Sequence, residues 1–476
     1  RGQASGEDVF SPGYFAITPK EGDTTTLIAL AAREEKQLPQ NRPEYFSKES
    51  FKSLFAAEEK RLKGVIQQIP QKYRQDDFLQ QLAIAIDLFI VNRDGLKTVI
   101  AGFPWFTDWG RDTFIAALGM LKAGRTAEVK DIILRFARFE EKGTLPNIIE
   151  GEEAGNRDTV DAQLWFFQVV DNYIKEVGSD AILQEKISSD RSILNVLDSI
   201  AQYYISGTEN GIVMDQNSGL IFSPSHYTWM DTNYPACTPR KGYPVEIQAL
   251  WHGALNFLST NLSDTKLKNQ YQTLAKQVKD NFLKLFWNEE GEYLFDNLQA
   301  EQEQGAFDAI KDYAFRSNQS IAISLGILEG EKAQKVVKQM MDRLVIPSGI
   351  RSLSEDTVSI DGFSYCGSYS GAEGSSPIQS QNPRKFAYHN GTAWSHPLGE
   401  FMIAYVKAFD NHPDAKKEIQ QLFECIKQHL GEGGIANISE IMDGSWDGIS
   451  RHYPRGCSEQ AWGATEFFRA YAEILY

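Results

Sequence analysis

Apolar residues recur at intervals of three and four positions along most of the chain, and this spacing predicts amphipathic helices. Several consecutive helical segments are joined by only a few residues, as at Gly124, Gly330 and Pro413, and short joints favour antiparallel neighbours. Long loops rich in glycine, serine and aromatic residues separate these pairs. Twelve helices are expected from residue 75 onward, at 75–91, 111–123, 126–140, 159–176, 190–206, 244–261, 264–287, 317–329, 331–344, 392–409, 413–430 and 458–474.

This alternation of short and long joints predicts an all-α (α/α)6 toroid, with six inner helices ringed by six outer ones and a few short β-hairpins. The long loops would gather at one end and form the active face. A hairpin is expected at 89–101, where Asp94-Gly95 supplies a strong turn, and a further helix at 48–63. Residues 1–46 are turn-rich and lack a helical period, so we expect strands and a linker there and the toroid at 47–476.

Charge and cysteine content narrow the classes of function. The net charge of −16 argues against a nucleic-acid partner, because phosphate binding needs a positive surface, and it suits a neutral substrate. The 4 cysteines, Cys237, Cys366, Cys425 and Cys457, are widely spaced, so we expect no disulfide framework and a reducing, cytoplasmic environment. No apolar run reaches the length of a membrane span, so no membrane partner is expected.

The motifs of several catalytic classes are missing from the sequence. It contains no Gly-rich phosphate loop, nucleophile elbow or dinucleotide fingerprint, so no cofactor is expected. His389 and His396 lack nearby acidic or cysteine partners, which favours structural histidines over a metal site. Chemistry that needs only carboxylates and water is the economical alternative, and glycoside hydrolysis is of that kind.

The stretch 102–114 combines aromatic, acidic and basic side chains immediately before an apolar helical segment. Aromatic faces beside charged groups suit a sugar, which stacks its CH surface on a ring and hydrogen-bonds through its hydroxyls. The alternative is a strand-to-helix corner whose aromatic residues belong to the core and whose Arg111 pairs with Asp112. In the functional interpretation this stretch binds the terminal sugar, Asp108 accepts from its hydroxyls, and Arg111 orients Asp108.

Two long loops offer carboxylates for acid–base chemistry. Asp231 follows Trp229 and Met230, and an apolar flank disfavours the ionised form of a carboxyl group, as a general acid requires. The alternative is that Asp231 caps a short turn. Glu440, between Ile438 and Ile441 in a glycine-rich run, is the preferred second carboxylate. Its competitors for that role are Glu432, Asp443 and Asp447.

Ordered blocks of the sequence resemble the glucosidase half of glycogen debranching enzymes of prokaryotic type, the amylo-α-1,6-glucosidase domain. The first and longest is Phe103-Pro-Trp-Phe-Thr-Asp-Trp-Gly-Arg-Asp-Thr113, and Thr228-Trp-Met-Asp231 and Ser439-Glu-Ile441 carry the two carboxylates. The remaining blocks are 145–147, 161–166, 238–240, 244–247, 316–319, 349–353, 388–392, 454–457 and 460–462.

The resemblance implies an (α/α)6 barrel that hydrolyses α-1,6-linked glucose stubs of glycogen or limit dextrin with inversion, without metal or organic cofactor. It implies that Asp231 is the general acid and Glu440 the general base, with carboxyl groups roughly 6.5–9.5 Å apart so that a water fits between base and sugar. It also implies that residues 1–46 are the tail of a β-rich N-terminal domain missing from this chain.

Within these blocks and the neighbouring polar-aromatic stretches, a larger set of residues is expected to bind the substrate. They are Trp105, Phe106, Asp108, Trp109, Arg111, Asp112, Asn147, Asp161, Trp165, Trp229, Arg240, Glu246, Arg316, Gln319, His389, Thr392 and Trp394.

Two departures from the family's pattern concern specificity. Thr232-Asn233 stands where relatives often have Ala-Lys, and Asn390 stands where they have Gln. Another exo-acting α-glucosidase or oligosaccharide hydrolase on the same barrel is therefore an alternative, and a non-catalytic glucan-binding module is a second one. Retention of both Asp231 and Glu440 argues against the binding module.

Overall fold

The computed structural model describes residues 16–18, 20–23, 25, 48–150, 153–367, 369, 383–446 and 452–476. The chain divides into two units, Gly2–Gln68 and Ile69–Tyr476. The described part of the first unit is chiefly one helix, α1 (Lys48–Gln68). The expected linker or tail at 1–46 lies almost entirely outside the described residues and stays a prediction.

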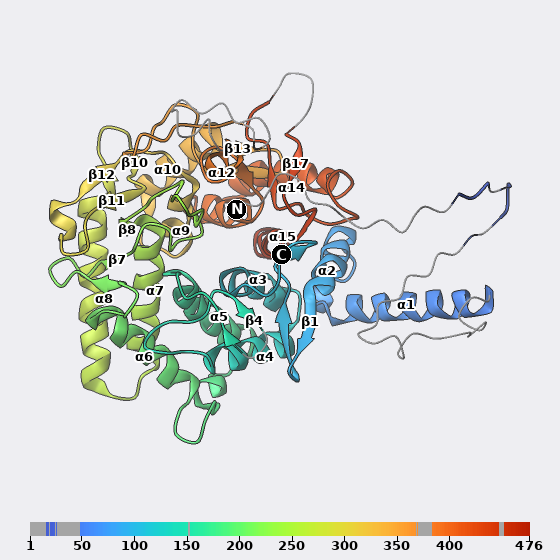
Figure 1. Ribbon diagram of the computed structural model, residues 1–476, viewed down its shortest axis with the longest axis horizontal. Helices are drawn as coiled ribbons and strands as arrows, with labels where there is room; N and C mark the ends of the chain where they lie inside the picture. The colour runs from blue at the N-terminus through green and yellow to red at the C-terminus, as the bar shows by residue number, and fades with distance from the viewer. Residues whose placement is uncertain are drawn as a thin grey trace. The chain divides into compact units, whose positions relative to one another are not determined.

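In the described residues of the second unit, twelve main helices alternate along the chain between an outer and an inner layer (Figure 1). The outer helices are α2 (Asp77–Phe89), α4 (Thr126–Ala137), α6 (Ile193–Ser206), α8 (Thr265–Phe286), α10 (Gly330–Arg343) and α14 (Pro413–His429). The inner helices are α3 (Gly110–Lys122), α5 (Ala162–Val177), α7 (Val245–Asn261), α9 (Ser320–Ser324), α13 (His396–Ala408) and α15 (Ala461–Leu475). A short helix, α12 (Pro383–Ala387), precedes α13.

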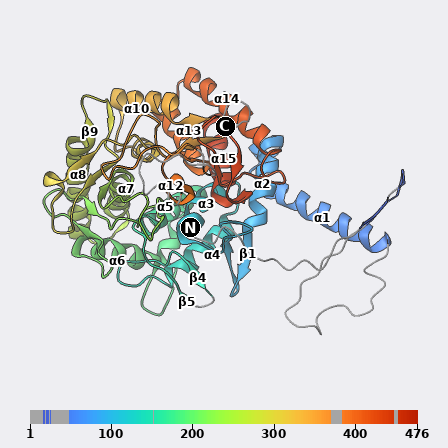
Figure 2. The ribbon, with the colours of Figure 1, turned by 45° about the horizontal axis from the view of Figure 1, so that its top comes forward.

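The inner helices form a closed ring. Each packs against the next in the order α3, α5, α7, α9, α13 and α15, and α15 returns to α3 (Figures 1 and 2). Outer helices are buried along one face only; in α8 the buried positions include Tyr271, Leu274, Val278 and Phe282. Inner helices are buried nearly all round, as in α3, where residues 110–121 are all buried. The predicted (α/α)6 toroid is confirmed.

Two expected helices differ from the structure. The segment expected at 317–329 is a 3₁₀ turn (Ser317–Gln319) followed by the short α9, which ends just before Gly326 at φ +75°. The helix expected at 392–409 begins at His396, because Ala393–Trp394 pairs as a strand instead. The first helix ends in a local turn that closes on Ala322, and in the second, strand pairing takes the place of helical hydrogen bonds.

Short strands connect the loops between the helices. The predicted hairpin is confirmed as β1 (Ile90–Arg93) and β2 (Leu96–Val99), with Asp94 and Gly95 at positive φ in the turn. The other strands are β3 (Gly102–Phe103), β4 (Ile149–Glu150), β5 (Glu153–Ala154), β6 (Val213–Met214), β7 (Ile221–Phe222), β8 (Gly242–Pro244), β9 (Trp287–Asn288), β10 (Tyr293–Leu294), β11 (Asn297–Gln299), β12 (Ile310–Asp312), β13 (Val345–Ile346), β14 (Gly349–Arg351), β15 (Ala393–Trp394), β16 (Ile441–Met442), β17 (Pro454–Arg455) and β18 (Glu459–Gln460).

One antiparallel sheet, in the order β13-β14-β15-β16-β17, joins two of the long loops, those that precede α13 and α15. Ile350 pairs with Trp394, and Ala393 pairs with Met442, so the segments that precede α13 and α15 lie side by side. Strand β18 pairs with β3, with Gln460 opposite Gly102. The loops before α3, α13 and α15 are thereby fixed at one end of the ring.

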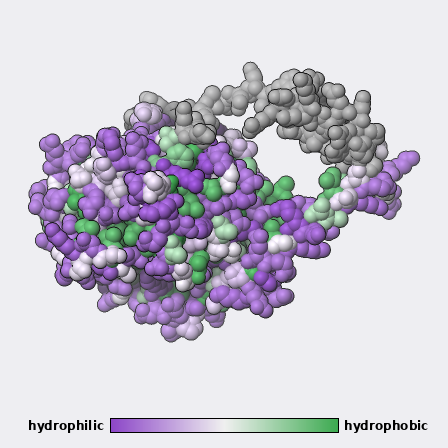
Figure 3. Space-filling view, turned by 90° about the horizontal axis from the view of Figure 1, so that it is seen from below, coloured by the Kyte–Doolittle hydropathy of each residue, from purple (hydrophilic) through white to green (hydrophobic). Residues whose placement is uncertain are grey.

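The surface of the second unit is largely polar on the face shown in Figure 3, with apolar residues in small scattered groups. Within the described ranges, no helix combines the length and the apolar character that a membrane span requires.

The closest helix contact in the ring depends on a glycine. A Cβ at Gly119 of α3 would lie 2.0 Å from the carbonyl oxygen of Thr465 in α15. We expect Gly119→Ala to lower the free energy of unfolding by about 1–3 kcal/mol, because a backbone atom cannot give way. Urea denaturation followed by circular dichroism measures the change.

The matched control is Gly64→Ala, at an exposed helical glycine with no atom within 4 Å of its added Cβ. This substitution should leave the main transition in place or stabilise α1 slightly, since alanine is the better helix former. Equal stability of Gly119→Ala and wild type would contradict the close-packing interpretation of the α3–α15 contact.

Candidate active site

A cavity opens where the N-terminal ends of α3, α13 and α15 meet the long loops. The residues that line it come from segments far apart in the sequence: Trp109, Arg111, Asp112, Trp229, Asp231, Tyr388, His389, Trp394, Glu440 and Trp462. Both predicted catalytic carboxylates, Asp231 and Glu440, therefore border the same cavity.

Asp231 is accessible from the cavity, since its side chain is 33% exposed. Its Oδ2 accepts a hydrogen bond from Nη1 of Arg111 at 3.0 Å. The two residues before it, Trp229 and Met230, are buried in the ring. The loop is thus anchored by apolar side chains while the carboxylate turns toward the cavity.

Arg111 connects this loop to the start of α5. Its Nε donates to both carboxylate oxygens of Asp161 at 2.8 Å, and its Nη2 donates to Thr159 Oγ1 at 3.2 Å and to the Tyr227 carbonyl at 3.3 Å. Burial would lower the pKa of Arg111, but the adjoining carboxylates of Asp161 and Asp231 raise it above its usual value. The guanidinium is permanently charged and fixed in place.

Glu440 is almost completely buried at 3% exposure. Its Oε1 accepts from the Tyr388 hydroxyl, and its Oε2 accepts from the Cys457 backbone N–H at 2.9 Å. Gly456 lies at φ +68°, and a Cβ there would come within 2.2 Å of Oε2. The close approach of the 456–457 backbone to the carboxylate therefore requires glycine.

The other acidic residues of this loop are placed differently. Asp443 pairs with Arg455, with Oδ2 accepting from Nε at 3.0 Å, and it also accepts from the Tyr369 backbone N–H. Glu432 is exposed, and Asp447 lies outside the described residues. Of the described candidates for the base, Glu440 is the one that lines the cavity.

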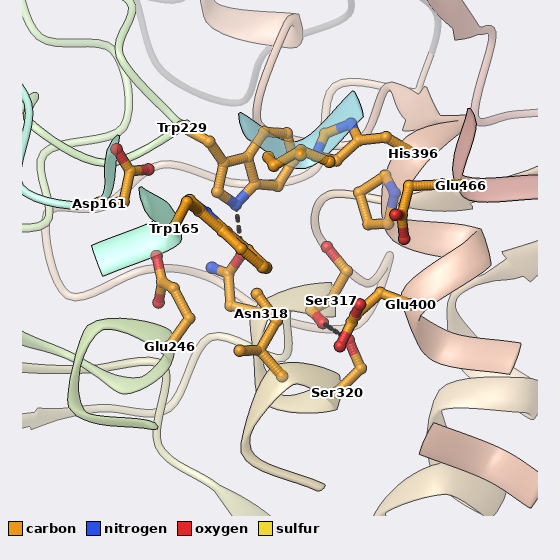
Figure 4. Close-up of a pocket in the computed structure, with 13 residues that line it drawn as sticks. Asp161, Trp165, Trp229, Glu246, Ser317, Asn318, Ser320, His396, Glu400 and Glu466 are labelled. Atoms are coloured by element: carbon orange, nitrogen blue, oxygen red, sulfur yellow. Dashed lines mark hydrogen bonds between the residues drawn. The ribbon is translucent and has the colours of Figure 1, made fainter. Parts of the chain in front are cut away.

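Aromatic rings form much of the cavity wall. Trp394 is stacked on His389 with centroids 5.1 Å apart and planes at 14°, and it meets the edge of Trp229 at 5.2 Å. The indole N–H of Trp229 donates to Asn318 Oδ1 at 2.7 Å, which fixes the orientation of the ring (Figure 4). The wall offers flat apolar faces in defined positions, as sugar stacking requires.

A second cavity lies inside the ring and shares Trp229 as a wall with the first (Figure 4). Three predicted substrate-binding residues, Asp161, Trp165 and Glu246, line this inner cavity and not the first. Glu466 also lines it, and burial raises its pKa to about 7 although Arg469 opposes the shift. Burial and the charge of Arg111 lower the pKa of His396 well below its usual range.

Several other predicted binders are engaged with the protein itself. Arg240 is buried and forms two hydrogen bonds to Glu246, and its Nε donates to Asp296 at 2.6 Å. Arg316 donates to the His389 carbonyl at 2.6 Å. These guanidiniums hold loops in position and do not line the cavity next to Asp231.

Gln319 has a similar internal role, since it accepts from the Leu294 backbone N–H and donates to the Arg316 carbonyl. Phe106 packs on Trp109 in a small core cluster with Ala101 and Cys457. The backbone carbonyl of Asn147 accepts from Gly110, at the start of α3.

The expected pairing of Arg111 with Asp108 is wrong. Asp108 is fully buried and accepts from Arg93 of β1 at 2.5 Å and from Thr98 of β2 at 3.4 Å, because the hairpin packs over this corner. Burial raises the pKa of Asp108, and the Arg93 charge opposes that shift. Trp105 is 66% exposed, and neither it nor Thr392 borders either cavity.

Two residues of the cavity that Asp231 and Glu440 border were not predicted to be functional. Tyr388 holds Glu440 through its hydroxyl, and Trp462 at the start of α15 forms part of the wall. Both stand inside sequence blocks that were recognised, Tyr388 next to His389 and Trp462 after Gln460-Ala461. Their side chains could not be placed before the pairing of β15, β16 and β18 was known.

Within the described ranges, no group of three or more His, Cys, Asp or Glu side chains is arranged to hold a metal ion. All four cysteines are free thiols, and Cys237, Cys366 and Cys457 are buried.

Comparisons with known proteins agree with this geometry. A glycogen debranching enzyme from Saccharomyces cerevisiae is 25% identical over 74% of this chain and 29% of its own length, so the chain spans less than a third of that relative. A wild-type glycosidase structure superposes with a TM-score of 0.52 at 11% identity, over 83% of this chain and 96% of that one. A rhamnosidase from Klebsiella oxytoca with bound rhamnose gives 0.50 at 13% identity, over 83% and 63%. Similarity at these identities indicates a shared fold alone.

Residues 82–469 match the family described as Amylo-alpha-1,6-glucosidase. The match begins within α2 and ends within α15, so it includes the first five inner helices, the first part of α15 and both carboxylates of the cavity. The chain therefore belongs to the amylo-alpha-1,6-glucosidase family, a family of glycoside hydrolases.

Proposed function

We propose that this protein removes α-1,6-linked glucose stubs from glycogen or limit-dextrin-type α-glucans by an inverting mechanism. The observation that carries the proposal is that Asp231 and Glu440, from loops before α7 and α15, border one cavity with aromatic walls. The family membership supports the substrate class. The free, dispersed cysteines support a cytoplasmic role in glycogen catabolism.

In the proposed reaction Asp231 protonates the glycosidic oxygen while Glu440 removes a proton from water on the opposite face of the sugar. The bond from the anomeric carbon to the leaving oxygen breaks as the bond to the water oxygen forms, so the configuration inverts. The products are β-glucose and the shortened glucan. The reaction needs no covalent intermediate.

The surroundings of each carboxylate fit its role. Tyr388 and the Cys457 N–H donate to different oxygens of Glu440, which orients the carboxylate at the cavity. Asp231 is held on one oxygen by Arg111 and is the more exposed of the two. Exposure on the cavity side is what contact with a leaving glucan chain requires.

The main alternative is a different linkage specificity. The same barrel and acid pair can serve other exo-acting α-glucosidases or oligosaccharide hydrolases, because a fold does not specify a substrate. Thr232-Asn233, directly after Asp231, is the departure most relevant to leaving-group choice.

Removal of either catalytic carboxyl group should abolish most activity. We expect Asp231→Asn and Glu440→Gln each to lower kcat/KM on an α-1,6-branched dextrin by about 10²–10⁴-fold, the range typical of general acid–base catalysis. Asp443→Asn is the matched control for Glu440, and it should cost far less because Asp443 pairs with Arg455. Near-wild-type activity of Asp231→Asn would refute the acid assignment.

The stereochemical outcome can be observed directly. Proton NMR immediately after mixing enzyme and substrate should show β-glucose first, with α-glucose appearing later by mutarotation. Initial release of α-glucose would rule out inversion.

A panel of α-1,6- and α-1,4-linked gluco-oligosaccharides separates the candidate functions. Glucose release should be fastest from substrates with a single α-1,6-linked glucose on an α-1,4-linked chain. Preference for α-1,4 linkages would favour the general α-glucosidase, and absence of glucose release from every member would favour the glucan-binding module.

A further inference from the structure

Asp161 does not reach the catalytic cavity, yet it binds the guanidinium that holds Asp231. We propose that Asp161 is a positioning residue for the general acid: it anchors Arg111 and offsets its positive charge, so that the Asp231 carboxyl can carry the proton needed for glycosidic cleavage. The proposal rests on the proposed function, in which Asp231 is that acid.

The geometry of the three groups is closely defined. Arg111 Nε donates to both oxygens of Asp161 at 2.8 Å, and a different nitrogen, Nη1, donates to Asp231 at 3.0 Å. Thr159 Oγ1 donates to Asp161 at 2.7 Å and accepts from Arg111 Nη2 at 3.2 Å. One guanidinium therefore stands between two carboxylates, with a hydroxyl bridging the inner pair.

Burial makes the inner pair electrostatically important. The side chains of Arg111 and Asp161 are each 2% exposed, whereas that of Asp231 is 33% exposed. Interactions between buried charges are screened weakly by water. The negative charge of Asp161 therefore offsets part of the positive charge that Arg111 presents to Asp231 at the cavity.

The charge balance bears on acid catalysis. A carboxyl group beside an isolated guanidinium favours the ionised form, which cannot donate a proton. Arg111 is not isolated, because Asp161 supplies a second negative charge that substrate and solvent do not reach. Asp161 thus lets Arg111 orient Asp231 without stabilising its ionised form as strongly as a lone guanidinium would.

The residue before Asp161 contacts the loop that carries the acid. Val160 N–H donates to the Tyr227 carbonyl at 2.9 Å, and Arg111 Nη2 donates to the same carbonyl. The start of α3 and the residue before Asp161 are thereby both joined, at one carbonyl oxygen, to the loop leading to Asp231.

Other titratable and charged groups face this cluster from the surrounding elements. Burial raises the pKa of Tyr204, and burial together with Arg111 lowers that of His396, so both are neutral near pH 7. Among them are Asp112 of α3, Tyr204 of α6, His396 of α13, Tyr388 and His389 after α12, and Glu440 before β16, together with Glu246 of α7 and Glu466 of α15, which line the inner cavity with Asp161. Substitution of Asp161 leaves all of them in place.

The test is the pH dependence of kcat/KM for Asp161→Asn on an α-1,6-branched dextrin. In wild type the basic limb reports loss of the proton from the acid. The substitution leaves Asp231 as the one ionisable carboxylate hydrogen-bonded to Arg111 among the described residues, so the basic limb should move to lower pH by about 1 unit or more. At a pH above both limbs, the ratio of kcat/KM to its value at the optimum should be about tenfold lower in the variant than in wild type. An unmoved limb in a variant with wild-type circular dichroism would overturn the proposal.

Thr159→Val is the matched control. It is nearly isosteric, keeps every charge, and removes the hydroxyl that contacts both Arg111 and Asp161. Its activity should fall while its basic limb stays at the wild-type pH. If the basic limb of Thr159→Val moved as far as that of Asp161→Asn, loosened structure and not lost charge would explain the shift, and the proposal would be overturned.

If Asp161→Asn does not fold, the double variant Arg111→Gln with Asp161→Asn can be tested in its place. It removes both buried charges together, so no unpaired charge is left in the interior. The summed charge of the two residues beside Asp231 is then zero, as in wild type, so its basic limb should lie at the wild-type pH or above. A limb displaced to lower pH would overturn the proposal. A wild-type protein that releases no glucose from any substrate would overturn the proposed function, and this inference with it.

Discussion

Closure of the inner ring by α15 is the constraint on which the rest of the structure depends. The last helix packs between α3 and α13, and at both contacts a glycine allows the backbones to approach: Gly119 faces Thr465, and Gly399 faces Glu466, with an added Cβ at 2.0 and 2.8 Å from the respective carbonyl oxygens. This contact brings together the N-terminal ends of helices more than 300 positions apart. Without it, the start of α3 and the start of α15 could not share one cavity.

Buried arginines connect the loops at the end of the ring to one another. Arg111, Arg240 and Arg316 are each almost fully buried, and each connects loops that would otherwise be independent. Arg240 and Arg316 both approach Asp296, which also accepts from Asn318, the partner of the Trp229 indole. Burying such ion pairs carries a large desolvation cost, so they fix the positions of the loops more than they stabilise the fold. The loop that carries Asp231 is therefore held by buried ion pairs on one side and by aromatic rings on the other.

Much of this architecture was visible in the sequence. The helical period and the joint lengths predicted the toroid, and Asp94-Gly95 predicted the hairpin. The distinction between substrate-binding and scaffold residues could not be predicted in the same way. Arg240 with Glu246 and Arg93 with Asp108 use the residue types that sugar sites use, and only burial and partner geometry show that these charges are engaged internally.

The sequence by itself determined the alternation of inner and outer helices, because hydrophobic period and joint length are local properties of the chain. It also indicated Asp231 and Glu440 as the preferred carboxylates. The tertiary structure alone decided which side chains surround them. Residues such as Tyr388, Asp161 and Trp462 acquire their roles from contacts with segments 50 or more positions away. Contacts of that range depend on ring closure and strand pairing, which no local pattern specifies.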